Sequence, residues 1–182
     1  LVCGRGAEGA LTVVEHGVPF RIVPGITAGI GGLAYAGIAA THRDINQSVT
    51  FLTGHDATGL MPDRINWEGT AQFSPVIVMY MAMKHIDLIT ERLMAAGRSP
   101  DEPVAFVCNA SLPEQVVLET TLSRAAADVD ASGLKPPAIV VVGEVVKLRS
   151  GLAWLGASPG RKLTSAPLHP HQENGRAVCR ER

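Results

Sequence analysis

The chain has 182 residues, enough for one domain or slightly more, and its formal net charge at neutral pH is −1. Hydrophobic residues make up 46% and charged residues 18% of it, which excludes wholesale disorder and low-complexity repeats. With 16 basic against 17 acidic residues, the charge balance gives no pull toward nucleic acid or an anionic membrane. Cys3, Cys108 and Cys179 are an odd number at scattered spacing, which favours a reducing compartment and predicts a cytoplasmic protein.

Hydrophobic periodicity and turn residues predict helices that alternate with strands. In chain order these are a helix over 7–16, a strand over 18–23, a helix over 27–37, strands over 48–53 and 76–80, a helix over 85–96, strands over 104–107 and 115–121, a helix over 123–131 that Ser123 caps, a strand over 139–142 and a short helix over 147–155. The apolar run at 76–80 is typical of a strand buried on both faces. The alternation predicts an α/β fold with a largely parallel or mixed sheet.

One uncharged stretch, residues 22–41, is about as long as a membrane-spanning helix. Pro24-Gly25 interrupts it, so that the helix predicted after this turn is too short to cross a bilayer. Its glycines weaken it further as a free-standing helix, but they suit a helix that lies very close to another backbone or to a ligand. We therefore expect a buried helix and no membrane segment.

The two ends of the chain differ from its middle. Residues 157–182 carry an excess of basic residues and show no apolar periodicity, so we expect a disordered tail. The chain begins at Leu1, without a methionine and inside a segment predicted to be structured. The sequence is therefore expected to be part of a longer protein.

Gly4-Arg5-Gly6-Ala7-Glu8-Gly9 matches the glycine pattern of dinucleotide-binding turns. A dinucleotide site also needs a full strand before the turn and an acidic residue about twenty positions after it, and this sequence has neither. We therefore expect a plain turn into a helix, where the guanidinium of Arg5 can face an anionic ligand.

Three further clusters carry polar or soft side chains at the predicted ends of elements. Thr27 follows a Pro-Gly turn between a strand and a helix, where it either caps the helix or donates to a ligand carboxylate or ribose. His42 and Arg43 can bind an anion, and no third ligand at a recognisable spacing supports a metal site. The methionines of 79–83 are either core filler or the apolar wall of a nucleoside pocket.

These pieces, in this order, resemble the uroporphyrinogen-III C-methyltransferases of the tetrapyrrole methyltransferase family, and more loosely the precorrin methyltransferases. The resemblance covers residues 1–156 and rests on an ordered set of short stretches. They are Cys3-Gly4-Arg5-Gly6, Glu15-His16-Gly17-Val18-Pro19-Phe20, Val23-Pro24-Gly25-Ile26-Thr27-Ala28, Tyr35-Ala36-Gly37-Ile38, Thr41-His42-Arg43-Asp44, Ser48-Val49-Thr50-Phe51, Gly54-His55, Trp67, Tyr80-Met81 and the run from Pro137 to Val146.

The resemblance implies a two-domain tetrapyrrole methylase fold with S-adenosylmethionine bound between the domains, no metal, and usually a homodimer. On this chain it implies a remnant of the N-terminal domain over 1–41 and a C-terminal α/β domain over 42–156. The cofactor contacts it implies are Val2, Thr27, Ala28, Met81, Ala110 and Ala138. The implied reaction is C-methylation of uroporphyrinogen III to precorrin-2, on the way to sirohaem and cobalamin.

A carboxylate-rich tetrapyrrole needs cationic partners, and we expect them to be Arg5, His42 and Arg43. The Gly-Pro-Gly-Asp and Gly-Gly-Asp-Pro turns that begin the family pattern are absent from this sequence, and the residues that manage protons are expected in that same portion. Two alternatives stay open beside the main interpretation: a precorrin methyltransferase of the same fold, and a catalytically inactive fragment that retains only partial ligand binding or dimerisation.

Overall fold

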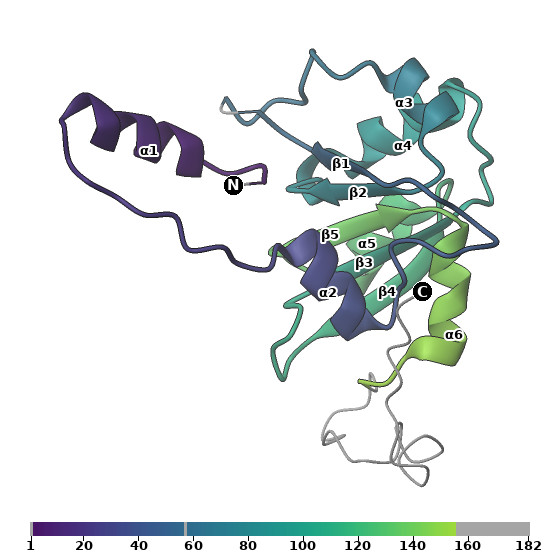
Figure 1. The fold of residues 1–182 in the computed structure, drawn as a ribbon. Coiled ribbons are helices and arrows are strands. Elements are labelled where there is room, and N and C mark those ends of the chain that lie inside the picture. Colours follow the sequence, from purple (N-terminus) through teal and green to yellow (C-terminus); the bar gives the residue numbers. More distant parts are fainter. Residues whose placement is uncertain (1, 57, 156–182) are drawn as a thin grey trace, which may run out of the picture.

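The structure is a computed structural model that describes residues 2–56 and 58–155 (Figure 1). The predicted tail, 157–182, lies outside the described residues. The strands are β1 (Thr50–Thr53), β2 (Ile77–Tyr80), β3 (Pro103–Cys108), β4 (Val116–Thr121) and β5 (Ala138–Val142). The helices are α1 (Gly6–Glu15), α2 (Ala28–Ala36), α3 (Trp67–Phe73), α4 (Ile86–Ala95), α5 (Ala125–Ser132) and α6 (Arg149–Leu152), with 3₁₀ turns η1 (Met83–His85) and η2 (Glu144–Leu148).

The strands form one mixed sheet in the order β1-β2-β5-β3-β4. Only β1 and β2 pair in parallel, whereas β5 runs antiparallel to both of its neighbours and β4 runs antiparallel to β3. The predicted α/β fold with a mixed sheet is confirmed. Because β5 lies reversed between β2 and β3, the carboxyl ends of β1, β2 and β3 and the amino end of β5 share one edge of the sheet.

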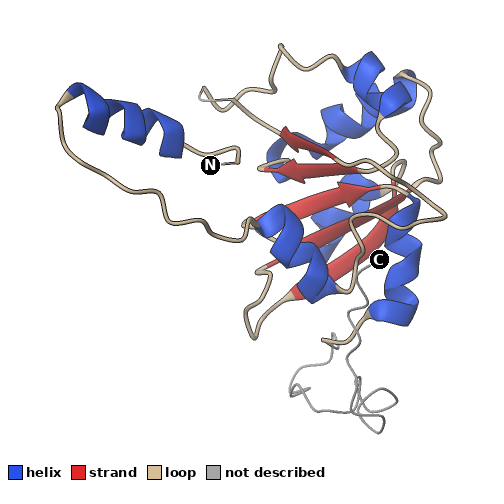
Figure 2. Ribbon diagram, in the orientation of Figure 1, coloured by secondary structure: helices blue, strands red, loops and turns tan. Residues whose placement is uncertain are grey.

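Helices cover both faces of this sheet (Figure 2). In β2, Ile77 and Met79 pack with α3, α4 and α5, while Val78 packs on the other face with α2 and η2. The predicted burial of this strand on both faces is confirmed, because all three of these side chains are fully buried. Burying a large aliphatic side chain contributes about 1.5–3 kcal/mol, so these two layers supply most of the hydrophobic stabilisation.

Helix α2 is held on the sheet at its carboxyl end. Leu33 and Ala36 are buried against the sheet, and Gly37 ends the helix in the left-handed conformation with φ of 70°. Two carbonyls of the last turn accept hydrogen bonds from distant side chains: Trp154 Nε1 donates to Ala34 at 2.8 Å, and Gln115 Nε2 donates to the next carbonyl at 3.1 Å. The division of the chain at residue 41 stays a prediction, but α2, which precedes it, packs on this sheet.

The segment before α2 departs from the prediction. Helix α1 forms as expected, but none of its residues is buried. The strand predicted over 18–23 is wrong, because that segment has no regular structure and Phe20 and Val23 are exposed. A strand needs a neighbour for its backbone N–H and C=O groups, and none of the described strands pairs with this one. Apolar alternation alone therefore gave a false prediction.

Two helix starts also differ from expectation. Helix α3 lies in a stretch where we predicted no element, although Asn66 caps it by accepting a hydrogen bond from the Gly69 N–H at 2.8 Å. Arg124, not Ser123, occupies the N-cap of α5, and the Ser123 hydroxyl instead contacts the Thr121 hydroxyl.

No helix in the described ranges has the length and hydrophobicity needed to cross a membrane. The most suspect stretch forms α2, which has only 9 residues.

Candidate functional site

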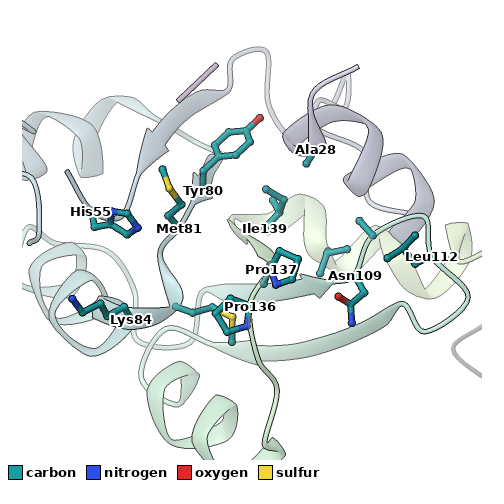
Figure 3. Close-up of a pocket in the computed structure, with 14 residues that line it drawn as sticks. Ala28, His55, Tyr80, Met81, Lys84, Asn109, Leu112, Pro136, Pro137 and Ile139 are labelled. Carbon is teal, nitrogen blue, oxygen red and sulfur yellow. The ribbon is translucent and has the colours of Figure 1, made fainter. Parts of the chain in front are cut away.

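A cavity of about 590 Å³ lies at the sheet edge where β1, β2 and β3 end (Figure 3). Its walls come from the residues that follow these strands, from the segment entering β5 and from the start of α2. Most of the lining is apolar, and no carboxylate belongs to the lining drawn from the described chain. A concave apolar surface with a few polar groups is typical of sites for small organic ligands.

The structure brings together four of the predicted cofactor contacts in this cavity. Ala28 begins α2, Met81 follows β2, Ala110 follows β3 and Ala138 begins β5, and all four line the cavity. These residues are far apart in sequence and meet because their elements share one sheet edge. Val2 does not line the cavity and is 47% exposed.

Thr27 does not line the cavity, but it precedes the lining residue Ala28 and contacts another lining residue. Its hydroxyl is 2.6 Å from the hydroxyl of Tyr80, the last residue of β2, and Tyr80 itself lines the cavity. The same phenol oxygen accepts a hydrogen bond from the Gly29 N–H at 3.0 Å. The start of α2 is thus tied to the end of β2 by polar contacts.

Two turns at the site have constrained backbones. Met81 and Asn109 adopt the left-handed conformation, with φ of 54° and 48°, directly after β2 and β3. Non-glycine residues adopt this conformation at a cost of about 1 kcal/mol or more, and such strain concentrates at functional sites. Beside them Gly54 donates its N–H to the Tyr80 carbonyl at 2.7 Å, and a Cβ there would overlap the backbone of Ala82.

The polar end of the cavity carries His55 and Lys84. The Nδ1 of His55 lies 2.9 Å from the Asp56 carbonyl, which can only accept, so Nδ1 carries the hydrogen and Nε2 is the acceptor of the neutral ring. Lys84 Nζ donates to the Gly59 carbonyl at 2.9 Å, which ties the loop after β1 to η1. A hydrogen bond from the Thr58 hydroxyl lowers the pKa of Asp56 below its usual value.

Two described cysteines have raised pKa values because burial disfavours the thiolate. Cys108 ends β3 and is 1% exposed, whereas Cys3 is exposed. Neither lines the cavity. Their raised pKa values make both poor nucleophiles at neutral pH.

The three predicted substrate residues do not line this cavity. Arg5 occupies the N-cap of α1 and forms an exposed ion pair with Glu8 at 3.2 Å. The N–H of His42 donates to Asn46 Oδ1 at 3.0 Å, within the turn that follows α2, and Arg43 is exposed beside it. All three remain predictions as substrate contacts.

In the described part of the chain, no three His, Cys, Asp or Glu side chains form a group that could hold a metal ion. For binding and orienting an organic ligand, the lining offers apolar walls, the Tyr80 hydroxyl and the polar side chains of His55, Lys84 and Asn109.

Comparison with known proteins decides the family. A family described as the tetrapyrrole (corrin/porphyrin) methylases matches residues 1–126, more than half of the 182 residues. The chain belongs to the tetrapyrrole methylase family. The predicted family is confirmed, whereas the division into two domains stays a prediction.

Three relatives illustrate how this tetrapyrrole methylase compares with other members. A uroporphyrinogen-III C-methyltransferase of Sinorhizobium is 74% identical over 92% of the chain and 60% of its own length. A siroheme synthase of Thiobacillus denitrificans is 46% identical over 92% of the chain and 35% of its own length. The chain thus spans about three fifths of the first relative and a third of the second.

The third relative is a solved structure. It is a uroporphyrin-III C-methyltransferase from Thermus thermophilus, complexed with S-adenyl homocysteine. It superimposes with a TM-score of 0.68 at 32% identity, over 81% of this chain and 63% of that one.

Some lining residues of this tetrapyrrole methylase were missed as site residues. Asn109 follows a predicted buried strand, and that position alone could have indicated it. Pro136 and Pro137 precede β5, and they reach this edge only because β5 runs antiparallel to β2 and β3. Strand direction is not encoded locally, so no sequence signal distinguished them.

Proposed function

We propose that the protein to which this chain belongs catalyses S-adenosylmethionine-dependent C-methylation of uroporphyrinogen III to precorrin-2, and that this chain supplies the cofactor cavity. The observation that carries the proposal is the meeting of Ala28, Met81, Ala110 and Ala138 around one cavity. All four stand at positions that the family resemblance implies as cofactor contacts. The names of the two uroporphyrinogen-III methyltransferase relatives support the substrate.

The residues present fit S-adenosylmethionine. The cavity of about 590 Å³ is ample for a nucleoside with an amino-acid side arm, and Met81 and Ile139 offer soft apolar surface to a purine and a sulfur atom. The cofactor supplies an electrophilic methyl group on its sulfonium. What this chain's residues do is bind and orient it: small side chains at 28, 110 and 138 leave room, and the constrained turn at Met81 fixes one wall.

The proposed substrate contacts are Arg5, His42 and Arg43. Cationic side chains outside the cofactor cavity suit the propionate and acetate groups of a tetrapyrrole, because a guanidinium pairs with a carboxylate through two parallel hydrogen bonds. Arg43 is exposed, so reversing its charge should leave the fold intact. In the protein that transfers the methyl group, Arg43→Glu should raise the KM for uroporphyrinogen III, and an unchanged KM would refute this role.

The cofactor proposal is tested by titrating the chain with S-adenosylhomocysteine in a calorimeter. Ala28→Phe places a ring in the cavity and should weaken binding more than tenfold, since an apolar wall would occupy the ligand's space. Ile30→Phe is the matched control, because Ile30 lies on the same helix, is 46% exposed and does not line the cavity. Absence of binding by the unsubstituted chain at millimolar ligand would refute the proposal.

A second candidate is a domain that binds the cofactor without methylating the tetrapyrrole. It is favoured by one observation: Arg5 pairs with Glu8 at the start of α1, a helix with no buried residue, so Arg5 is not held toward the cavity. A radiolabelled methyl-transfer assay with uroporphyrinogen III separates the two candidates. The assay uses the protein to which this chain belongs: binding of S-adenosylhomocysteine without transfer supports the second candidate, and methyl transfer refutes it.

We also propose that the protein is a cytoplasmic homodimer. The exposed apolar side chains of Phe20, Ile22, Val23 and Ile26 offer a surface for self-association, and the free cysteines fit a reducing compartment. Sedimentation equilibrium tests the homodimer: a mass of one chain at all concentrations would contradict it.

A further inference from the structure

The threonine at the start of α2 does not cap its own helix. Thr27 occupies the N-cap position in extended conformation, with φ of −71° and ψ of 146°, where a threonine hydroxyl ordinarily accepts a hydrogen bond from the second or third N–H of the helix. No such side-chain bond forms here. Its hydroxyl is turned instead toward Tyr80, at 2.6 Å.

Tyr80 takes over the capping role from a different element. Its phenol oxygen accepts the Gly29 N–H at 3.0 Å, the bond that an N-cap side chain usually makes. The approach depends on glycine, because a Cβ on residue 29 would overlap the Tyr80 hydroxyl and crowd the ring of Phe51. Phe51 in turn packs on the Tyr80 ring, with centroids 6.3 Å apart, and limits where the phenol can point.

Either hydroxyl can donate in the contact between Thr27 and Tyr80, and one of the two directions links Gly29, Tyr80 and Thr27 in series. The Gly29 N–H can only donate, so it occupies an acceptor position on the phenol oxygen. The phenol has one hydrogen, and the Thr27 oxygen is its nearest hydrogen-bond partner. A chain in which Gly29 donates to Tyr80 and Tyr80 donates to Thr27 uses each group once and is cooperative. In this series of hydrogen bonds, the hydrogen of the Thr27 hydroxyl stays available for an acceptor atom of a bound ligand.

We propose that Tyr80 is a positioning residue for the cofactor cavity: it holds the amino end of α2 against β2 and orients the Thr27 hydroxyl as a donor to an oxygen of the bound nucleoside or its carboxylate. The inference rests on the proposed binding of S-adenosylmethionine in this cavity. Its location supports the role, because Tyr80 and Ala28, the residue after Thr27, both line the cavity, and the phenol hydroxyl points toward the start of α2 (Figure 3).

The test is a double-variant cycle measured by calorimetry with S-adenosylhomocysteine. Tyr80→Phe and Thr27→Val should each raise the Kd about three- to tenfold, the usual effect of losing one neutral hydrogen bond. Both substitutions act through the Thr27 hydroxyl. The Kd of the double variant should therefore be no higher than the higher of the two Kd values of the single variants. Thr27→Ser keeps the hydroxyl and should restore affinity. Losses that multiply in the double variant, or an unchanged Kd for Tyr80→Phe, would overturn the proposal.

Tyr35→Phe is the matched control. The chain has only two tyrosines, and Tyr35 lies on α2 with its ring against Trp154, away from the cavity lining. Removing its hydroxyl should leave the Kd unchanged.

A ligand-free measurement separates failure of this inference from failure of the proposed function. Hydrogen exchange at the Gly29 amide should be slow in the unsubstituted chain and in Tyr35→Phe, and faster in Tyr80→Phe. If the unsubstituted chain binds no S-adenosylhomocysteine, the proposed function fails, and faster exchange in Tyr80→Phe still supports the tie between Tyr80 and α2. Equal exchange in all three proteins overturns it.

Discussion

At the residue scale, glycines and strained backbones set the shape of the cavity. Gly29 admits the Tyr80 hydroxyl, and Gly54 lets the loop after β1 lie on the turn after β2. Gly32 faces Ala110 across a distance that leaves no room for a larger side chain, since a Cβ on residue 32 would lie 3.0 Å from the Ala110 Cβ. The walls of the cavity are therefore shaped by three close approaches, in which Gly29, Gly32 and Gly54 lie against their neighbours.

Gly29→Ala tests how tightly these walls are built. An alanine favours a helix by up to about 1 kcal/mol over glycine, but its Cβ would displace Tyr80 and break the bond that caps α2. Overpacking of this kind costs about 1–3 kcal/mol, so we expect a net loss of about 1 kcal/mol in the free energy of unfolding. Urea titration followed by circular dichroism measures it.

Gly25→Ala serves as the comparison for Gly29→Ala. It precedes the same helix, and a Cβ there would meet no atom within 4 Å. Its free energy of unfolding should match or slightly exceed that of the original chain. If both variants were equally stable, the close approach of Tyr80 would not constrain residue 29.

Individual site residues were predictable only where their type was informative. Thr27 follows a Pro-Gly turn and Met81 ends a buried strand, so both could be singled out from the sequence. Whether Thr27 caps its helix or faces a ligand stayed open, because the answer depends on Tyr80, 53 positions away. Contacts over such separations are set by tertiary packing and leave no local pattern.

At the element scale, β4 and α5 are joined by an ion-linked contact. The Thr120 hydroxyl donates to Asp128 Oδ2 at 2.5 Å, and Arg124 donates to the other carboxylate oxygen at 3.0 Å. The bond from Thr120, followed by the neighbouring Arg124, lowers the pKa of the Asp128 carboxyl below its usual value. A depressed pKa stabilises the folded chain above the pKa of the unfolded state, and this stabilisation is lost as the pH falls through the folded value.

Thr120→Val should therefore destabilise the chain in a pH-dependent way. At pH 6 Asp128 is ionised and the variant lacks a charge-assisted hydrogen bond, whereas below the folded pKa the carboxyl is protonated and less is lost. The difference in unfolding free energy between the two proteins should shrink as the pH falls from 6 toward 3. Thr121→Val, whose hydroxyl contacts only Ser123, should show a pH-independent difference. A constant difference for Thr120→Val would contradict this account.

Most elements were predictable because their signals are local. Gly37 and Gly133 end α2 and α5 in the left-handed conformation, and the strands predicted over 76–80 and 139–142 are β2 and β5. Helix α3 was missed although Asn66 is a recognisable cap, because its seven residues show too little periodicity. The strand predicted over 18–23 failed for the opposite reason: its alternation was local, but its pairing would have to come from elsewhere.

At the scale of the whole molecule, the order of the strands decides where the cavity lies. The last strand, β5, is inserted antiparallel between β2 and β3, which brings Ala138 beside Cys108 and so next to the residues that follow β3. Such non-local pairing follows from how all the elements pack together, and periodicity says nothing about it. The sequence therefore predicted most of the elements, while the single edge where Ala28, Met81, Ala110 and Ala138 meet emerges only in three dimensions.

The described chain consists of a packed body and an amino-terminal part that does not pack on it. Helix α1 has no buried residue, and the segment that joins it to α2 carries an exposed Arg21 with no regular structure around it (Figure 1). Backbone without hydrogen bonds or packing opens to a protease active site at almost no free-energy cost. Arg98, by contrast, is fixed by Glu102 and by the Ser74 carbonyl and has a side chain only 7% exposed.

Limited digestion with trypsin should therefore cut after Arg21 well before it cuts after Arg98, at a protein concentration where the chain is monomeric by sedimentation. The order follows from the opening free energies, which are close to zero at Arg21 and approach the global free energy of unfolding at Arg98. Mass spectrometry of a time course gives the order, and Arg21→Gln, which removes the site, should delete that first product alone. The packed body should keep its circular dichroism after the cut, because α2 and the sheet hold their contacts without α1. Slow cleavage at Arg21 in the monomer would show that this segment packs against the body after all.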